Sequence, residues 1–239
     1  MAVDRQRRLL RRHGPDLHLR AAAGLLNPSA PPAAPIRFGP VDIAFDRTVL
    51  RPRPWTLAQS EWAAELASGA ATLLELGCGA GQIGLAAAAL SGCRVVQVDR
   101  DPGACRWAAH NASANGLGDL VEQRCGVAQD VLGANERFGV VIADPPYVPS
   151  SDVHLYPEDP LGAIDGGTDG LDSVRAFVTA VAPHLGPGGS VVIQVRGRGQ
   201  VDRLAKWLQD SGSPPLVVAE ARSYGDQRAL ARLEAGSGL

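Results

Sequence analysis

Apolar and polar positions follow two alternating periods from residue 72 onward. Short apolar runs rich in Val, Leu and Ile indicate buried strands, and longer stretches with helical spacing indicate helices. The predicted strands are 72–76, 94–98, 120–124, 138–143, 190–195, 215–220 and 228–234. The predicted helices are 82–90, 102–115, 171–185 and 200–211. This alternation predicts an α/β fold in which a seven-stranded, mostly parallel sheet has helices on both faces.

The final two predicted strands, 215–220 and 228–234, end the sheet differently from the others. The segment between them is too short for a crossover helix, so we expect an antiparallel hairpin. The last strand of the sheet is therefore predicted to be antiparallel.

Residues 1–35 do not follow either period. The segment 4–12 (DRQRRLLRR) is very basic and is either a short helix or a solvated arm, because so short a helix is marginal alone. The segment 27–35 (NPSAPPAAP) has the composition of an extended Pro/Ala linker. We therefore expect residues 1–35 to be an arm and linker, and residues 36–239 to be the main domain.

Residues 36–54 form the lead-in to this domain. Apolar and polar residues alternate around Gly39-Pro40, which predicts a hairpin. Residues 51–54 (RPRP) predict a stiff extended element. Thr56 is predicted to cap a helix that runs to about Ser68.

Composition and charge narrow the class of protein. The chain has 239 residues, of which 45% are hydrophobic and 20% charged, and these values exclude a disordered chain, a collagen-like repeat and a coiled coil. Residues 1–53 have a net charge of +6, whereas the remainder has −8. Because nucleic-acid binding depends on Lys and Arg, the acidic body disfavours a nucleic-acid partner, and only the basic arm offers such attraction.

The four cysteines form no C-x-x-C pair and no Cys/His cluster with metal-ligand spacing. We therefore expect no metal site and a reduced, cytoplasmic location. The first residues lack the apolar core of a signal peptide, and no apolar run approaches the roughly 20 residues that span a bilayer. The sequence thus predicts no membrane association.

A glycine-rich segment, 74–84, lies between the first buried strand and its helix. Glycines allow a sharp turn and the close approach of a ligand, and the helix behind them presents unpaired N–H groups. Asp99 ends the next strand, 22 residues after Gly77, where a carboxylate can accept both hydroxyls of a ribose. These features predict a nucleoside-bearing cofactor. The predicted cofactor-binding residues in this region are Glu75, Gly77, Cys78, Gly79, Ala80, Gly81, Asp99 and Arg100.

Residues 79–84 also match the dinucleotide pattern G-x-G-x-x-G. The register argues against that interpretation, because the strand ends at Leu76 and the turn begins two residues too early. The other alternative is a plain strand–helix turn without a ligand, but such a turn would need only one glycine. Within the loop we assign Cys78 a packing role, since nothing nearby would activate its thiolate.

The fourth predicted strand of the α/β region ends in Asp144-Pro145-Pro146-Tyr147. The two prolines remove two backbone donors and fix two φ angles, which leaves the carbonyls of Asp144 and Pro145 free to face a ligand. The Asp144 carboxylate adds an acceptor, and Tyr147 adds a flat face. Together, Asp144, Pro145, Pro146 and Tyr147 predict a site that holds a planar NH₂ group by hydrogen bonds from its two hydrogens. We call this site the clamp. The alternative is a rigid turn at the strand end.

The two loops resemble known families. Residues 75–81 (ELGCGAG) resemble the E/D-x-G-x-G-x-G loop of class I S-adenosylmethionine (SAM) methyltransferases, which have a Rossmann-like fold. The chain over about 36–235 resembles the HemK family of protein-(glutamine-N5) methyltransferases, which carries N-P-P-Y, D-G-G-x-D-G-L-D and V-L-I-P-R-P. The matching residues here are 144–147, 165–172 and 49–54. The resemblance implies SAM as cofactor, transfer to a protein glutamine and a release-factor-like protein partner.

Three departures from the family pattern keep the substrate open. Asp144 replaces the usual Asn, as in many enzymes that act on adenine. Cys125-Gly126-Val127 stands where an acidic residue is usual, and Val127 is assigned to pack on the adenine ring. Only about 35 residues precede the hairpin, too few for the family's helical N-terminal domain. The alternatives are therefore adenine in RNA or DNA, a small metabolite and, least favoured, a non-catalytic SAM-binding protein.

Overall fold

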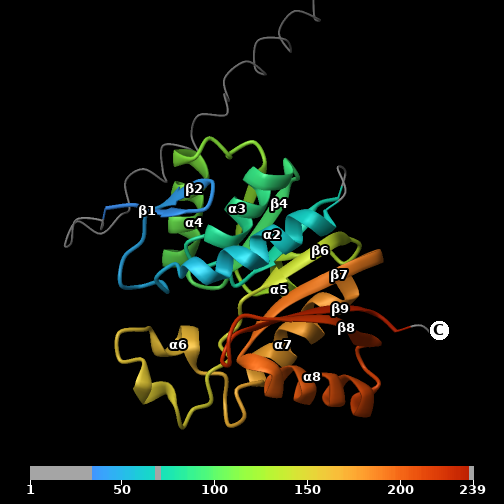
Figure 1. The fold of residues 1–239 in the computed structure, drawn as a ribbon. Helices are drawn as coiled ribbons and strands as arrows, with labels where there is room; N and C mark the ends of the chain where they lie inside the picture. Colours follow the sequence, from blue (N-terminus) through green and yellow to red (C-terminus); the bar gives the residue numbers. More distant parts are fainter. Residues whose placement is uncertain (1–33, 68–70, 237–239) are drawn as a thin grey trace, which may run out of the picture. The chain divides into compact units, whose positions relative to one another are not determined.

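The computed structural model describes residues 34–67 and 71–236, which belong to one compact unit. Its centre is a seven-stranded sheet with the order β5-β4-β3-β6-β7-β9-β8 (Figure 1). The strands are β3 (Leu73–Leu76), β4 (Val95–Asp99), β5 (Val121–Cys125), β6 (Phe138–Ala143), β7 (Leu185–Val195), β8 (Leu216–Ser223) and β9 (Ala229–Ala235). The predicted arm falls mostly on residues 1–33, outside the described residues.

The strand pairing confirms the predicted mixed sheet. Strands β5, β4, β3, β6 and β7 are parallel neighbours, whereas β9 is antiparallel to both β7 and β8. The last strand therefore inserts between β7 and β8. The short connection after β8 requires this hairpin, because it leaves no room for a helix that would return the chain in parallel.

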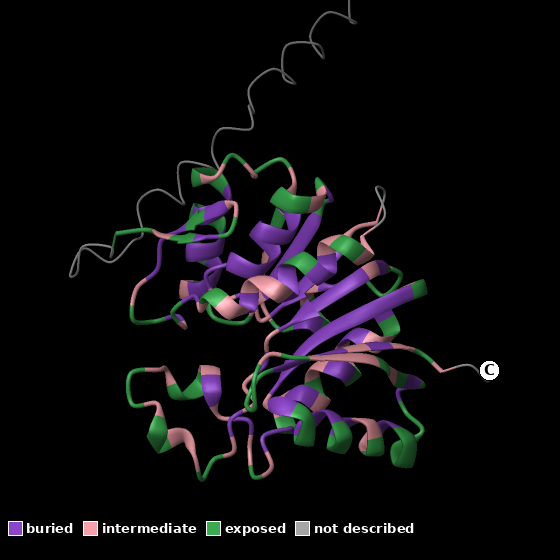
Figure 2. Cartoon of the chain, viewed as in Figure 1, coloured by how far each residue is buried: buried purple, intermediate pink, exposed green. Residues whose placement is uncertain are grey.

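Helices cover both faces of the sheet, each over its own core. The helices α2 (Leu57–Leu66), α3 (Gln82–Ser91) and α4 (Pro102–Ala114) lie on one face. The helices α5 (Ala128–Val131), α7 (Asp172–Val181) and α8 (Gly197–Ser211) lie on the other. Because side chains alternate along a strand, Leu73 joins the first core and Leu74 the second. Figure 2 shows the resulting buried centre.

The lead-in is a short hairpin that is tied to the rest of the fold by asparagines. Strands β1 (Ile36–Phe38) and β2 (Val41–Ile43) pair around Gly39-Pro40, as predicted. The Asn111 side chain on α4 accepts from the Ala44 N–H (2.9 Å) and donates to the Ala44 and Ala80 carbonyls (2.8 and 2.9 Å). Asn111 thus joins the lead-in to the glycine loop, and Asn115 bonds the Asp42 backbone in the same hairpin.

The predicted cap at Thr56 is wrong. A 3₁₀ turn, η1 (Pro54–Thr56), precedes α2, so the chain already turns helically before Leu57. The Thr56 side chain caps no helical N–H; its hydroxyl donates to the Arg53 carbonyl at 2.9 Å. The 3₁₀ turn is the physical reason for the difference, because its Pro54 and Trp55 carbonyls accept from the Leu57 N–H at the start of α2.

Other boundaries differ where the sequence lacks a clear period. Helix α7 ends at Val181 and is followed by η3 (Ala182–His184), which contains Pro183, and β7 then begins five residues before its predicted start. The short elements α5, α6 (Leu161–Ile164) and η2 (Val153–Leu155) were not predicted, because helices of three or four residues have no detectable periodicity. No described helix has the length and apolar character needed to cross a membrane.

The glycine loop is braced from beneath by a buried carboxyl group. Glu75 on β3 is 3% exposed, and its Oε2 accepts a hydrogen bond of 2.6 Å from Gln97 Nε2 on β4. A Cβ at Gly84 would lie only 2.3 Å from this oxygen, so any side chain at position 84 would displace the Glu75 carboxyl group. Burial raises the pKa of Glu75 to about 8, although Gln97 and the Gly84 N–H oppose the shift.

The raised pKa of Glu75 predicts how stability changes with pH. Between its ordinary value of 4.5 and about 8, the folded state binds more protons than the unfolded state, so the free energy of unfolding falls as pH rises. We expect a decline of about 2–4 kcal/mol between roughly pH 5 and 8, which Glu75→Gln should reduce because glutamine imitates the neutral acid. Urea denaturation at each pH measures this.

The control is Glu136→Gln. Arg124 holds the pKa of Glu136 at about 2, so this carboxyl is ionised throughout the same pH range and its variant should keep the wild-type slope. An equal slope in the wild type and Glu75→Gln would contradict the assignment.

Candidate active site

The two loops singled out in the sequence leave the same edge of the sheet. Strands β3 and β6 are adjacent and parallel, and Leu76 pairs with Ala143 at their carboxyl ends. The next residues are Gly77, which opens the glycine loop, and Asp144, which opens the D-P-P-Y loop. The carboxyl ends of parallel strands are where α/β proteins bind ligands.

Backbone bonds and left-handed glycines shape the glycine loop. The N–H groups of Gly77 and Cys78 both donate to the Val98 carbonyl on β4 (2.8 and 3.2 Å). Gly77, Gly79 and Gly81 have φ values of 71°, 56° and 83°, which only glycine adopts readily. A Cβ at Gly79 would meet nothing within 4 Å, so this part of the loop faces open space.

Asp99 is bonded to the glycine loop, whereas its predicted contact with a ribose stays a prediction. Its Oδ2 accepts from the Gly79 N–H and its Oδ1 from the Asp101 N–H, both at 2.9 Å. Each oxygen keeps further lone-pair capacity for a hydroxyl donor. Asp99 is half-buried at the end of β4. The carboxylate is thus fixed in position and available to a ligand that lies along the loop.

The other predicted cofactor residues have different placements. Cys78 is buried, and burial raises the pKa of its thiol well above the usual range, which agrees with a packing role. Glu75 lies beneath the loop as its brace, and Arg100 is exposed beside Asp99. Val127 is 44% exposed just after β5, the strand that pairs with β4 at Asp99. Direct contact of these four side chains with a cofactor stays a prediction.

One buried atom fits a cofactor of the expected kind. Gln82, the first residue of α3, is 7% exposed and lines the cavity described below, yet its Oε1 has no hydrogen-bond partner among the described residues. A buried acceptor without a partner costs free energy unless a ligand supplies a donor. Gln82 Oε1 and the Asp99 carboxylate are acceptors for the amino and hydroxyl groups that a nucleoside-bearing cofactor such as SAM carries, and Gly79 leaves open space beside them.

The D-P-P-Y loop is held by the 165–172 element behind it. Gly166 N–H donates to the Val148 carbonyl (2.8 Å), and a Cβ at Gly166 would lie 2.8 Å from the Pro146 carbonyl oxygen. A Cβ at Gly170 would lie 2.4 Å from the Tyr147 carbonyl oxygen. That same carbonyl accepts from Gln200 Nε2 on α8 at 2.8 Å. The glycines of the D-G-G-x-D-G-L-D element are therefore needed for close backbone packing.

The first two backbone carbonyls of the loop, unlike that of Tyr147, are available to a ligand. Within residues 34–67 and 71–236, neither the Asp144 nor the Pro145 backbone carbonyl accepts a backbone hydrogen bond outside the regular elements. Burial raises the pKa of the Asp144 side chain to about 7, while the charge of Arg53 acts in the opposite direction. Burial also raises the pKa of Tyr147, so its phenol stays neutral. The loop thus presents several acceptors beside one aromatic ring.

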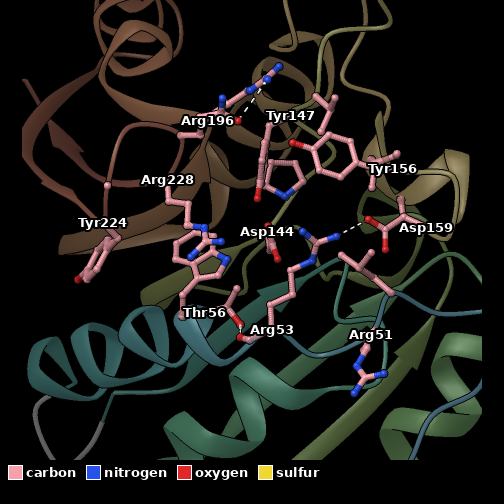
Figure 3. Close-up of a pocket in the computed structure, with 18 of the residues that line it drawn as sticks. Arg51, Arg53, Thr56, Asp144, Tyr147, Tyr156, Asp159, Arg196, Tyr224 and Arg228 are labelled. Carbon is pink, nitrogen blue, oxygen red and sulfur yellow. Dashed lines mark hydrogen bonds and ion pairs between the residues drawn. The ribbon is translucent and has the colours of Figure 1, made fainter. Parts of the chain in front are cut away.

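A cavity of about 450 Å³ opens in front of Asp144 (Figure 3). It is lined by all three tyrosines of the chain and by one tryptophan, although the sequence has few aromatic residues. Most of the lining comes from the lead-in, the D-P-P-Y loop, the 156–164 segment and the tip of the β8–β9 hairpin, and Gln82 and Arg196 complete it. Its aromatic residues are Trp55, Tyr147, Tyr156 and Tyr224.

Arg53 crosses this cavity and was not among the predicted site residues. It points past Asp144 toward Asp159, with which it forms an ion pair, and its guanidinium lies 6.0 Å from the Tyr156 ring centroid (Figure 3). Arg196, after β7, pairs in the same way with Asp152. The 150–165 segment is thus joined to the body by two arginines. The RPRP motif was a signal for Arg53, whereas nothing in the sequence indicated its partner.

Trp55 and the β8–β9 hairpin pack together in the wall of the cavity. The Arg228 guanidinium lies 5.7 Å from the Trp55 ring centroid, and the Tyr224 and Trp55 centroids are 6.1 Å apart. The hairpin tip is closed by a 2.8 Å bond from the Tyr224 N–H to the Arg228 carbonyl. These residues are far apart in sequence, so no local pattern could have grouped them.

Comparison with known proteins places the chain in a family. A family model described as ribosomal protein L11 methyltransferase (PrmA) matches residues 56–144. A release factor glutamine methyltransferase of Geobacter sulfurreducens is 35% identical over 77% of this chain and 65% of its own length. One of Cereibacter sphaeroides is 32% identical over 79% of this chain and 68% of its own length. The chain spans slightly less than two thirds of the length of the former.

Solved structures share the fold. The hMettl16 catalytic domain in complex with an RNA hairpin of MAT2A has a TM-score of 0.64 and 17% identity, over 82% of this chain and 75% of that one. M. jannaschii TYW2 in complex with AdoMet has a TM-score of 0.58 and 13% identity, over 88% and 89%. The fold is therefore that of class I SAM-dependent methyltransferases, as the sequence indicated. By its sequence relatives, the chain belongs to the family of release factor glutamine methyltransferases.

Proposed function

We propose that the chain is a SAM-dependent N-methyltransferase that acts on the side-chain amide of a glutamine in a release-factor-like protein. The observation that supports it most directly is the position of Asp144 and Pro145 beside the glycine loop, across the adjacent ends of β3 and β6. Membership of the family supports the glutamine substrate. The four free cysteines agree with a cytoplasmic location.

The proposed site would bind the cofactor along the glycine loop. Asp99 would accept the ribose hydroxyls, and Val127 would cover one face of the adenine. Gln82 Oε1 would accept from the amino group at the methionine end. SAM supplies an electrophilic methyl group on a sulfonium, so the main task of the protein is alignment.

The proposed clamp would hold the nitrogen that receives the methyl group. An amide NH₂ has two hydrogens, which Asp144 and the Pro145 carbonyl would accept, so that the nitrogen faces the methyl donor. Tyr147 would pack on the plane of the amide. No base is needed before transfer, because the amide proton leaves afterwards. The aromatic residues that line the cavity, Trp55, Tyr156 and Tyr224, would exclude water from this plane.

The substrate is tested by tritium transfer from labelled SAM. The full chain is incubated with an unmethylated release factor, with total RNA, with DNA and with a small-metabolite fraction. Label on a glutamine side chain of the release factor, located by mass spectrometry and absent when that glutamine is replaced by glutamate, is the expected result. Label in adenine or in a metabolite would show that the substrate is not a protein glutamine. The absence of label from every fraction would contradict the methyltransferase activity.

The cofactor assignment predicts the effect of Asp99→Ala. Loss of a carboxylate that accepts ribose hydroxyls should weaken SAM binding by about 1.5–3 kcal/mol, the scale of hydrogen bonds to a charged group. Isothermal calorimetry measures this change. Asp130→Asn removes an exposed carboxylate on α5 and should leave the affinity unchanged. NADH binding as tight as that of SAM would contradict the assignment.

The clamp predicts the effect of substitutions at Asp144. Asp144→Ala should lower kcat by about 10²-fold or more, as for the loss of one preorganised catalytic hydrogen bond, with little change in SAM affinity. Asp144→Asn keeps one acceptor oxygen and should retain more activity on a neutral amide. Single-turnover kinetics compares the variants, with Asp202→Asn on the exposed face of α8 as control. Full activity of Asp144→Ala would exclude the clamp.

A further inference from the structure

A second groove adjoins the cavity of the candidate active site. It has a volume of about 590 Å³ and lies between the lead-in and the 150–165 segment. Figure 3 shows Arg53 of the lead-in extending toward Asp159 and Tyr156 of that segment. Four residues line both spaces, so the groove is continuous with the cavity. They are Arg51, Arg53, Tyr156 and Asp159.

Apolar side chains from both segments line the groove. Phe45 and Val49 of the lead-in contribute to it and are otherwise buried. Leu155 and Pro160 line it from the other segment, and Leu155 is 57% exposed. A single exposed leucine needs no explanation, but one that shares a groove with other apolar side chains offers them jointly to a ligand.

Ion pairs on both sides of Leu155 in the sequence hold it in this exposed position. Asp152 is paired with Arg196, and its carbonyl accepts from the Leu155 N–H at 3.0 Å. Asp159 is paired with Arg53, and the Asp159 side chain is only 5% exposed. The apolar surface of the groove is therefore formed before a ligand binds, which reduces the ordering that binding would otherwise require.

The charges of the groove favour a polypeptide over a nucleic acid. Its charged lining residues are three arginines and three acids, so the groove has no excess positive charge that would attract phosphates. Arg51 is exposed, and its guanidinium lies 5.9 Å from the Phe45 ring centroid. It presents N–H donors, which main-chain carbonyls accept, beside the apolar lining.

We propose that the groove binds the stretch of the substrate protein next to the target glutamine and takes an apolar side chain from this stretch. A glutamine side chain is short, so the main chain that carries it must cross the mouth of the cavity and leave along the adjoining surface. In an extended chain alternate side chains point to the same side, so one of them enters the groove. The inference rests on the proposed function, which supplies the protein substrate.

Leu155→Asp tests the groove through the kinetics of methyl transfer from labelled SAM to an unmethylated release factor. Replacement of an apolar contact by a charge should raise KM for the release factor about tenfold. The value of kcat at saturation and the affinity for SAM should stay the same, because the cofactor loop and the clamp are unchanged. A role in the fold alone would not produce this separation of KM from kcat.

A double-mutant cycle identifies the side chain that occupies the groove. Synthetic peptides centred on the target glutamine of the release factor carry serine in place of each flanking apolar residue, one at a time. One of these peptides should lose about tenfold in kcat/KM with the wild type and nothing further with Leu155→Asp, because the two changes remove the same contact.

Leu161→Asp is the matched control. Leu161 belongs to the same segment and is 59% exposed, but it lines neither the groove nor the cavity. This variant should keep the wild-type KM. Circular dichroism checks that both variants fold. If Leu155→Asp does not fold, Leu155→Ser takes its place, and a smaller rise in KM is then expected.

The possible failures are distinguishable. Methyl transfer to the release factor with the same KM in the wild type and the folded Leu155 variant would overturn the groove and leave the proposed function intact. Label only in adenine or in a metabolite would overturn both. Self-association of the wild type in sedimentation experiments, abolished by Leu155→Asp, would assign the groove to a second copy of the chain and also overturn the proposal.

Discussion

The parallel pairing of β3 with β6 is the constraint on which the site depends. It brings the end of one buried strand, which leads into the glycine loop, directly beside the end of another, which leads into the D-P-P-Y loop. The two loops take their shapes for different reasons. Left-handed glycines and bonds to the Val98 carbonyl shape the first, and two prolines with close glycine packing shape the second. Neither loop alone forms a site.

Carboxyl groups are concentrated at this edge of the sheet, and burial gives them different roles. Glu75 is enclosed beneath the glycine loop with a pKa of about 8, and Asp144 faces the cavity with a pKa of about 7. Asp99 is half-buried and already accepts two backbone N–H bonds. Neighbouring acids in different surroundings can thus have different roles. Glu75 supports the loop as a neutral acid, Asp144 is a titratable acceptor, and Asp99 is a carboxylate held by backbone hydrogen bonds.

The cavity in front of Asp144 is closed by parts of the chain that are distant in sequence. Arg53 and Arg196 hold the 150–165 segment through Asp159 and Asp152. The β8–β9 hairpin brings Arg228 over Trp55. A site assembled in this way presents a wide aromatic surface to a substrate while its acceptors stay at the end of one strand.

The sequence by itself determined the sheet, its antiparallel end and the two loops, because local periodicity, glycine and proline act over a few residues. It indicated Asp99 and Asp144 through their positions at strand ends. The tertiary structure decided the rest: the buried position of Glu75 beneath the glycine loop, the ion pair between Arg53 and Asp159, and the hydrogen bonds of Gln59 with the Ala143 carbonyl and with Gln194. These contacts join residues separated by 84 to 135 positions, or depend on which face of a strand is enclosed. Local pattern does not contain that information, because burial and pairing partners are fixed only when the sheet is assembled.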